Sequence, residues 1–332
     1  MTYPKIELHV HLEGTVRPAA LLRMARRNDY ALPANSPREM AALYEFEDFT
    51  HFLKVWALTT NALRTEQDFR EVVVDYAAEA AAHGAIYLEG IFSPAEAVAR
   101  GMTWEEAFAG CCDGVQEARE RYGIQVALTP DIPRNYPIEA AELTVTYAIA
   151  NASRGVVGVG LGGSEAHPPA PFKAVFARAK DAGLGSVPHA GENGGPVSIR
   201  SALTALGADR IRHGIRAVQD QALVTELAER GIVLDVCPTS NLRTGVVSSL
   251  AEHPLPALLA AGVSCTINTD DPAMFGTDLG TEHAVALALG ATARASYEAG
   301  VKGALCDDVT KTRLRQLGDE FDWSAATEQA TA

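Results

Sequence analysis

Residues 222–236 of the chain read ALVTELAERGIVLDV. Its first part, residues 222–229, has a helical pattern, and its last part, residues 232–236, is a short apolar run typical of a buried strand. Gly231 stands between the two parts, where helices are commonly ended by a residue in the left-handed conformation. The stretch therefore predicts a helix, a glycine cap and a strand in direct succession.

The same unit recurs along the chain. Further helical patterns occupy residues 172–182, 197–206 and 255–260, and they are followed by Gly183, Gly207 and Gly262. Eight short apolar segments are expected to form strands, near residues 5–9, 85–91, 124–129, 155–161, 185–189, 209–213, 232–236 and 263–268. Strands and helices that alternate eight times favour one α/β domain over residues 1–332, a closed (β/α)8 TIM barrel.

An open, doubly wound sheet is the alternative fold for this alternation. Such a sheet commonly carries a glycine-rich phosphate-binding loop after a strand. Neither G-x-G-x-x-G nor G-x-x-x-x-G-K-[ST] follows any expected strand, which argues against a nucleotide-binding sheet. The barrel is therefore the fold that we predict.

The connection after the first strand is unusually long. Residues 15–84 contain several helical patterns, and an insertion of this size at the end of a barrel strand predicts a helical lid. Four large apolar residues within it recur at helical spacing: Phe49, Phe52, Leu53 and Trp56. They either pack against the barrel or form an apolar wall over a flat substrate. At the other end of the chain, residues 324–332 are expected to form a flexible tail.

The composition excludes several classes of function. The chain has 332 residues, of which 47% are hydrophobic and 21% charged, and its net charge of −14 opposes binding to nucleic acid. No run of 18 apolar residues predicts a membrane span, and no signal sequence precedes the first strand. The five cysteines do not form a disulfide framework, so we expect a cytoplasmic protein. The oligomeric state stays open.

Histidines and acids stand where several of the expected strands end. The first strand ends in His9 and His11, whose i, i+2 spacing puts both imidazoles on one face of an extended chain. Taken alone, this pair also fits one packed and one solvent-exposed histidine. The fifth, sixth and eighth strands are followed by His189, by His213, and by Asp270 with Asp271. The carboxyl ends of barrel strands meet at one mouth, so these side chains are expected to converge.

Three imidazoles and a carboxylate suit one zinc or a similar divalent ion, with room for a water. Such an ion lowers the pKa of its bound water from about 15.7 towards 7. Glu192 lies three residues after His189 and has the chemistry of a general acid. His213 is placed to orient or deprotonate the water. The set predicts hydrolytic attack on an electron-poor carbon.

Four short motifs, taken in their order along the chain, resemble those of a known family. They are ELHVHLEG at 7–14, HAGE at 189–192, CPTSN with TG between 237 and 245, and NTDDP at 268–272. Together they resemble the adenosine deaminase family of metal-dependent amidohydrolases, from about residue 4 to residue 320. The resemblance implies one zinc per chain, held by His9, His11, His189 and Asp270.

The resemblance also implies roles for other residues. Glu192 would donate a proton to purine N1, and His213 would lie beside the attacking water. Asp271 would contact N7, the backbone N–H of Gly163 would contact N3, and Glu13 would reach the sugar. The reaction implied is hydrolysis of a 6-aminopurine nucleoside to its 6-oxo product and ammonia.

Two departures from the family pattern concern the substrate. Ser164 stands where family members acting on adenosine commonly have an acid, and Ile91 stands where many have an arginine. Both changes are expected to remove charge near the pocket and to suit a 5′-modified adenosine such as 6-aminodeoxyfutalosine as well as adenosine. The alternatives are adenine deaminase, a single-metal amidohydrolase of another substrate, and a non-catalytic binding barrel.

Overall fold

The computed structural model describes residues 3–324, and within them the strands pair in parallel. The strands are β1 Lys5–His11, β2 Ala85–Ile91, β3 Gln125–Leu128, β4 Asp131–Pro133, β5 Gly158–Gly162, β6 Gly185–Ser186, β7 His189–Ala190, β8 Arg210–His213, β9 Val233–Val236 and β10 Ser264–Ile267. They form three sheets, in the orders β1-β2-β3, β4-β5-β6 and β7-β8-β9-β10. An α/β fold with parallel sheets is thus confirmed.

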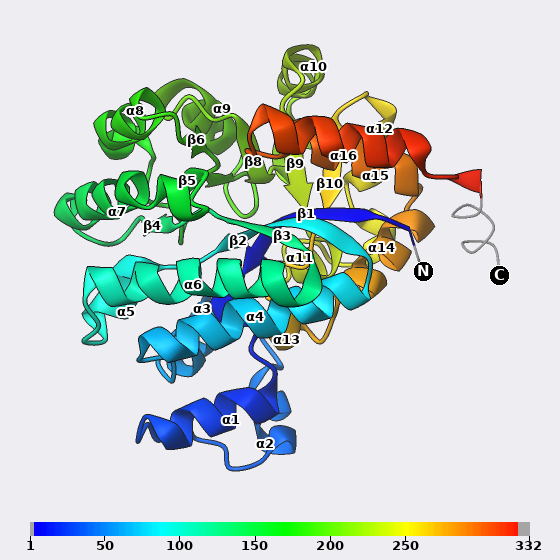
Figure 1. Ribbon diagram of the computed structural model, residues 1–332. Helices are drawn as coiled ribbons and strands as arrows, with labels where there is room; N and C mark the ends of the chain where they lie inside the picture. The colour runs from blue at the N-terminus through cyan, green and yellow to red at the C-terminus, as the bar shows by residue number, and fades with distance from the viewer. Residues whose placement is uncertain (1–2, 325–332) are drawn as a thin grey trace.

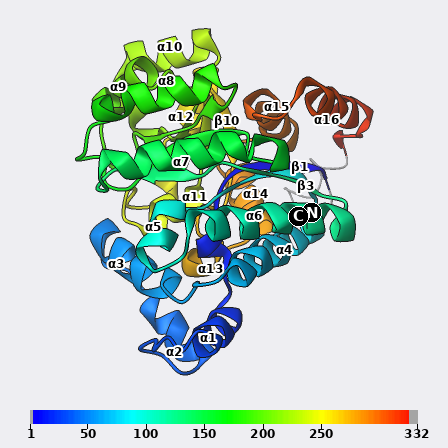
Figure 2. The same ribbon diagram turned by 60° about the vertical axis from the view of Figure 1, so that its left-hand side comes forward.

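Helices surround the strands (Figures 1 and 2). They are α1 Pro18–Arg27, α2 Pro37–Leu43, α3 Phe49–Thr60, α4 Glu66–Ala82, α5 Pro94–Ala99, α6 Trp104–Tyr122, α7 Ile138–Ala150, α8 Lys173–Asp181, α9 Pro196–Ala205, α10 Gln221–Arg230, α11 Pro238–Arg243, α12 Leu255–Ala260, α13 Pro272–Phe275, α14 Leu279–Ala288, α15 Ala293–Gly303 and α16 Asp308–Glu320. Short 3-10 helices are η1 Leu12–Thr15, η2 Ala152–Arg154, η3 Ala170–Phe172, η4 Ile215–Gln219 and η5 Leu250–Glu252.

All eight expected strands are present, but two of them are interrupted. The third is divided into β3 and β4 around Pro130, and the fifth into β6 and β7 around Pro188. Proline has no backbone N–H to donate to a neighbouring strand, which accounts for both breaks. Each break lies just before a residue that lines the cavity described below: Asp131 after the first break and His189 after the second.

Backbone hydrogen bonds also join the edges of the three sheets. The N–H of His11 donates to the carbonyl of Asp270, just after β10, at 2.8 Å. The N–H of Leu128 in β3 donates to Gly155, just before β5, at 2.8 Å. The N–H of Val187, between β6 and β7, donates to Val159 in β5 at 3.0 Å.

The glycines predicted to end helices do so. Gly183, Gly207, Gly231 and Gly262 follow α8, α9, α10 and α12, with φ angles of +87°, +57°, +65° and +80°. A residue with a Cβ atom is strained in this left-handed region. Each glycine therefore lets the chain leave a helix and enter the next strand within a few residues.

Four helices, α1 to α4, occupy residues 15–84. Helix α4 lies against α6, where Gly110 and Gly114 allow the close approach, since a Cβ atom on Gly110 would lie 2.4 Å from the carbonyl oxygen of Glu66. Helices α1 and α2 project from the rest of the molecule in both ribbon views. Helices α1 and α2 are thus more peripheral than α4.

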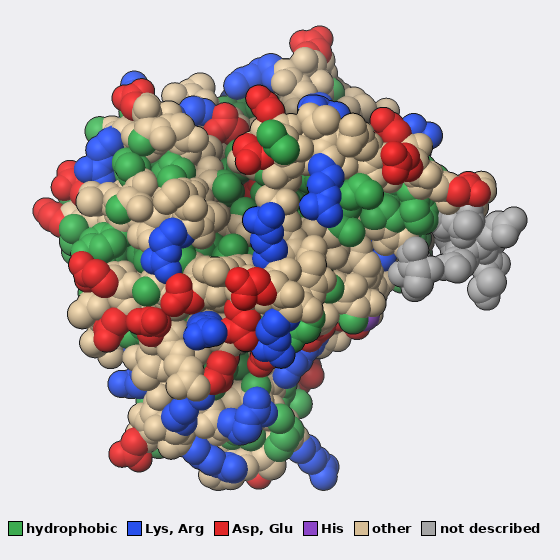
Figure 3. Space-filling model, in the orientation of Figure 1, with side chains coloured by type: hydrophobic (Ala, Val, Ile, Leu, Met, Phe, Trp, Pro, Cys, Tyr) green, Lys and Arg blue, Asp and Glu red, His purple; other side chains and the backbone are tan. Residues whose placement is uncertain are grey.

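Acidic and basic side chains are interspersed on the face shown in Figure 3, and basic ones also lie over the projecting end. Among residues 3–324, no helix is long and apolar enough to cross a membrane. Of the predicted tail at 324–332, residues 325–332 lie outside the described residues, so the tail stays a prediction.

A buried ionic cluster lies between the strands. Arg210 of β8 is fully buried, and its guanidinium donates to Asp235 at 2.6 Å and to Glu89 at 2.8 Å. A buried charge is tolerated only when it is paired and hydrogen-bonded. The strands are predicted from their apolar residues, so the sequence alone gives no role for the charged residues within them.

Candidate active site

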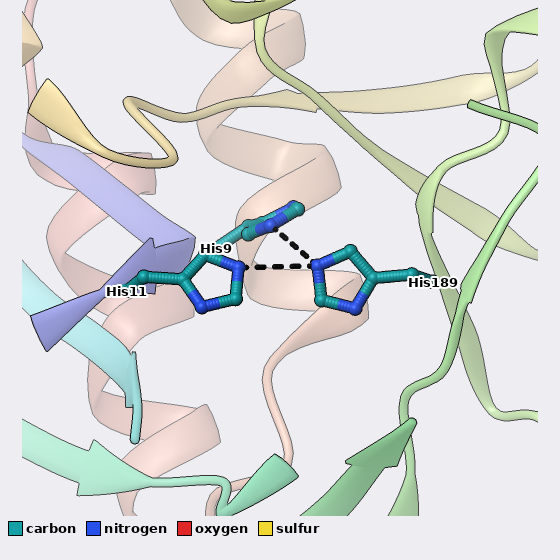
Figure 4. A group of neighbouring side chains, drawn as sticks. All are labelled: His9, His11 and His189. Carbon is teal, nitrogen blue, oxygen red and sulfur yellow. Dashed lines mark hydrogen bonds between the residues drawn. The ribbon is translucent and has the colours of Figure 1, made fainter. Parts of the chain in front are cut away.

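Three imidazoles and one carboxylate converge at the carboxyl ends of β1, β7 and β10, and Figure 4 shows the imidazoles of His9, His11 and His189 pointing at one another. The Nε2 atom of His189 lies 3.2 Å from the Nε2 atoms of both His9 and His11. The Oδ1 atom of Asp270 lies 3.3 Å from His9 Nε2 and 3.4 Å from His11 Nε2. Ligands placed tetrahedrally about zinc are separated by about 3.3 Å, so the donor set and its spacing fit a divalent ion.

The backbone brings Asp270 to β1 in an uncommon conformation. Asp270 has φ +63° and forms a parallel bridge with Val10, accepting the N–H of His11 and donating to the carbonyl of His9 at 3.2 Å. His213 has φ +61°. Positive φ is rare for residues other than glycine and is concentrated at functional sites. The chain therefore holds two of the predicted site residues in conformations that local preference disfavours.

Partners around the four donors fix their orientation. His189 Nδ1 lies 3.2 Å from the carbonyl of Leu161 and 3.4 Å from Asp131 Oδ2. Arg212 donates to Asp131 and, at 2.6 Å, to Thr129. Partners of this kind set which ring nitrogen faces a metal. The Nε2 atom of His189 is thereby presented to the cluster.

Two further contacts orient the donor set from β9 and α11. Ser240 donates its hydroxyl to Asp270 Oδ2 at 2.6 Å, so that Oδ1 is left towards the imidazoles. Cys237 Sγ lies 3.6 Å from His9 Nδ1. Ser240 belongs to the CPTSN motif, yet the motif by itself did not indicate what it contacts.

Glu192 is held by a second acid. The carboxylate of Glu165 accepts the N–H groups of Gly191 at 2.7 Å, Glu192 at 2.9 Å, and Asn193 and Gly194 at 3.0 Å. The turn that carries Glu192 is therefore fixed, and the Glu192 side chain is left free to face the cavity. Burial, followed by the charge of Asp270, raises the pKa of Glu192 well above its ordinary value. A protonated carboxyl group at neutral pH is the form that a general acid needs.

His213 is oriented by a relay that the sequence did not reveal. His253 Nε2 lies 3.2 Å from Asn241 Oδ1, and Asn241 Nδ2 lies 3.4 Å from His213 Nδ1. If the Asn241 amide donates to Nδ1, the His213 proton is on Nε2. That atom lies 3.7 Å from Asp270 Oδ2 and 3.8 Å from Glu192 Oε2. Burial lowers the pKa of His213, which favours this neutral form.

The site opens into a cavity of about 360 Å³. All four apolar residues predicted to wall the substrate, Phe49, Phe52, Leu53 and Trp56, lie on α3 and line this cavity. Phe52 also packs against Phe275, with ring centroids 5.1 Å apart. The two alternatives for these residues, packing against the rest of the protein and walling the substrate, are thus compatible, since α3 does the first and lines the cavity.

Helix α3 also contacts an acid of the site directly. The indole N–H of Trp56 donates to Asp271 Oδ1 at 3.0 Å. A Cβ atom on Gly14 would lie 1.8 Å from the same Oδ1 atom, so only glycine leaves room for this carboxylate. Burial and the charge of Asp270 raise the pKa of Asp271 well above its usual range.

Of the remaining predicted residues, two line the cavity and two are not among the lining residues. Gly163 and Ser164 line it, and Gly163 has φ +89°. Glu13 is buried, and its Oε1 accepts the N–H of Ser93 at 2.8 Å. Ile91 is fully buried and is not part of the cavity wall. The expectation that Ile91 removes charge near the pocket stays a prediction, for a buried residue outside the set that lines the cavity.

The sequence of the chain is similar to those of known deaminases. The sequence model of the adenosine deaminase family matches residues 4–320. An aminodeoxyfutalosine deaminase from Acidothermus cellulolyticus is 53% identical over 332 residues, covering 98% of this chain and 93% of that protein. An adenine deaminase from Sphingopyxis alaskensis is 42% identical, covering 82% of this chain and 80% of that protein.

Solved structures are also similar. The crystal structure of an adenine deaminase from Arthrobacter aurescens has a TM-score of 0.91 and 32% identity, covering 97% of this chain and 99% of that one. An amidohydrolase from Burkholderia ambifaria with bound zinc has a TM-score of 0.86 and 28% identity, covering 99% of this chain and 91% of that one. The chain belongs to the adenosine deaminase family, and it is a metal-dependent hydrolytic deaminase of a purine substrate.

Proposed function

We propose that the chain deaminates a 6-aminopurine nucleoside by hydrolysis, with one zinc ion held by His9, His11, His189 and Asp270. The observation that carries this proposal is the spacing of 3.2–3.4 Å between the donor atoms at the base of a cavity that Glu192 also lines. When bound, a divalent ion lowers the pKa of a coordinated water towards 7 and so supplies the nucleophile at neutral pH.

The side chains around the cavity then divide the proton transfers. Glu192 gives its proton to N1 as water oxygen adds to C6, which makes the ring accept the electron pair. The Nε2–H of His213 orients that water. Asp271 binds at N7 and the N–H of Gly163 at N3, which fixes the ring so that C6 faces the water. Over the reaction the water gives up both of its protons: one restores the acid form of Glu192, and the other reaches the amino nitrogen. Cleavage of the bond from C6 to that protonated nitrogen then releases ammonia and leaves the 6-oxo purine.

We infer further that the sheets close into one eight-stranded barrel forming a single domain, with residues 15–84 contributing a lid. The hydrogen bonds between sheet edges support closure, and α3 supports the lid because it walls the cavity. Within the lid segment we assign α1 to α3 to the cover, since α4 packs on α6 as a helix of the barrel wall does. Five unpaired cysteines suit a cytoplasmic location.

Adenosine and 5′-modified adenosines such as aminodeoxyfutalosine are the substrates that we propose. The relative at 53% identity carries the latter name. An apolar wall tolerates a bulky 5′ substituent better than polar groups fitted to a 5′-hydroxyl would, and α3 supplies such a wall. Adenine is the second candidate, because relatives at 42% and 38% identity are named adenine deaminases, although another at 42% is named an aminodeoxyfutalosine deaminase.

A deamination screen with metal analysis tests the proposal. Purified protein should contain one divalent ion per chain and release ammonia from adenosine, 5′-methylthioadenosine or 6-aminodeoxyfutalosine faster than from adenine. His9→Ala and His11→Ala should remove both metal and activity. Two ions per chain, or active protein without metal, would overturn the metal assignment. A preference for adenosine of more than about 100-fold over every 5′-modified analogue would overturn the tolerance at the 5′ position.

A further inference from the structure

A second polar cluster lies beside the cavity and is not used by the chemistry described above. It consists of Glu13, of Glu96 in α5, and of Arg100 at the end of α5. Among residues 3–324, twelve buried side-chain atoms have no hydrogen-bond partner, and four of them belong to this cluster: Glu13 Oε2, Glu96 Oε2, Arg100 Nε and Arg100 Nη2. Buried polar atoms are rarely left unpaired, so such a concentration calls for a ligand or ordered water.

The cluster continues from the base-binding end of the cavity. Glu96 lines the cavity together with Ser93, whose N–H holds the other oxygen of Glu13. The charge of Glu13 acts on Asp271 and on Glu96. Glu13 precedes Gly14, which closely approaches Asp271, and it binds Ser93 at the start of α5. It therefore connects the acid proposed to bind N7 with the helix that carries Glu96. If the purine lies at the metal end of the cavity, a group attached to its far side would meet this cluster at Glu96, the member that lines the cavity.

The unpaired atoms define the chemistry of such a group. Carboxylate oxygens accept hydrogen bonds and guanidinium nitrogens donate them, so hydroxyl groups, which do both, satisfy them together. Within residues 3–324, the Nε and Nη2 groups of Arg100 are buried without a hydrogen-bond partner, behind the part of the cavity wall that Glu96 forms. A phosphate would meet one guanidinium but two carboxyl groups, so the net negative charge of the cluster, when both acids are ionised, opposes it.

We propose that Glu96, with Glu13 and Arg100, forms a sugar subsite that selects an uncharged nucleoside over both the free base and the 5′-monophosphate. A sugar contact by Glu13 was already expected from the family resemblance, whereas Glu96 and Arg100 are new assignments. The inference rests on the proposed function, because it takes the purine to lie at the metal end of the cavity.

The preference for a nucleoside over the free base follows from the unpaired atoms of this cluster. A free base leaves the buried polar atoms of the cluster without partners, and sites of this kind reject analogues that lack the hydroxyl. Burial, followed by the charge of Glu13, raises the pKa of Glu96 to about 7. At neutral pH a share of the Glu96 side chains is therefore protonated and can donate as well as accept.

The test compares Glu96→Gln and Glu96→Ala with the exposed control Glu229→Gln, all metal-loaded, on adenine, adenosine, 5′-methylthioadenosine and AMP. The parent should prefer a nucleoside to adenine and to AMP. Glu96→Gln should lower kcat/KM for the nucleosides about 10- to 100-fold, the range of a hydrogen bond to a charged group. For adenine the change should stay within about threefold. The control should match the parent on every substrate.

Equal losses on adenine and on the nucleosides would assign Glu96 a structural role and overturn the proposal. A parent enzyme that prefers adenine or AMP would overturn it as well. If no 6-aminopurine is deaminated, the proposed function fails, and calorimetric binding of inosine and hypoxanthine then decides the subsite. Tighter binding of inosine that Glu96→Gln removes supports the subsite, and equal affinities contradict it.

Discussion

Among single residues, Glu192 gives the sharpest test of the chemistry. Its carboxyl group is buried, with a raised pKa, on a turn fixed by Glu165. Glu192→Gln keeps the size of the side chain, but an amide does not protonate N1. We expect kcat/KM to fall by at least 10²-fold, since general acid catalysis contributes about 10²–10⁴-fold. Metal content, measured by atomic emission, should stay at the parent level.

The control for this variant is Glu229→Gln, an exposed change on α10. A Glu192→Gln protein within tenfold of the parent would remove Glu192 from the role of general acid. Loss of metal together with activity would instead make Glu192 part of the ligand shell. The two measurements thus separate proton transfer from metal binding.

Glu7 provides a pH-dependent test of stability. It accepts from Tyr76 at 2.6 Å and from the N–H and hydroxyl of Thr269 at 3.0 and 2.7 Å, so it holds the residue before Asp270. Burial raises its pKa from 4.5 to about 7 despite these hydrogen bonds. A raised pKa stabilises the fold fully below the unfolded value near 4.5, and this contribution is lost as pH rises through about 7.

We therefore expect Glu7→Gln to gain on the parent as pH rises. The difference in unfolding free energy should shift in favour of the variant between pH 5 and 8, by up to about 3 kcal/mol. Urea unfolding at several pH values, with both proteins at the same metal content, measures it. A difference that stays constant with pH would contradict the raised pKa.

The sequence was sufficient for the ligand candidates, because His9, His11 and His189 end strands, and parallel strand ends converge by topology. It was not sufficient for the groups that orient them. Arg212 and Asn241 act across strands that are distant in sequence, and their partners are fixed only by side-chain packing. Nor does the sequence show whether Ile91 lines the cavity, because burial is a property of the packed structure.

At the scale of elements, the alternation of helices and strands was predictable from hydrophobic periodicity and glycine caps. The breaks in the third and fifth strands were not, although Pro130 and Pro188 are visible in the sequence. A single proline lowers the expectation of a strand without saying where pairing resumes. The neighbouring strand β8 decides where pairing resumes, because its N–H groups can still donate to the interrupted strand, as Arg212 does to the Pro188 carbonyl at 3.0 Å.

Helix α3 contacts the site through the hydrogen bond from Trp56 to Asp271, and the effect of this bond on catalysis can be tested. Trp56→Phe keeps an aromatic ring in the wall and removes the donor to Asp271 Oδ1. Because Asp271 is then less well oriented towards N7, we expect kcat/KM for a purine nucleoside to fall about tenfold, the value of one hydrogen bond to a charged group. The loss should largely vanish for a 7-deazapurine nucleoside, which has no N7.

The matched control is Leu53→Met, a change in the same wall that has no polar contact with Asp271. It should affect purine and 7-deazapurine nucleosides alike. If Trp56→Phe also lowers both to the same degree, Trp56 serves only as part of the apolar wall. Steady-state kinetics with the two nucleosides distinguishes these outcomes.

For the whole molecule, the proposed metal links parts of the chain that are far apart in sequence. His9 lies in the first strand, His189 in β7, and Asp270 follows the last strand. An ion that binds only the folded chain stabilises it by about 4 kcal/mol at a free concentration 1,000 times its Kd. We therefore expect chelation to lower the Tm by about 5–10 °C, and added zinc to restore it. His9→Ala should start from the lower Tm and respond little to the chelator. Calorimetric scans of the parent and the variant, with and without chelator, measure both effects. If metal removal is demonstrated and the Tm of the parent does not change, the ion serves the chemistry without holding the strand ends together.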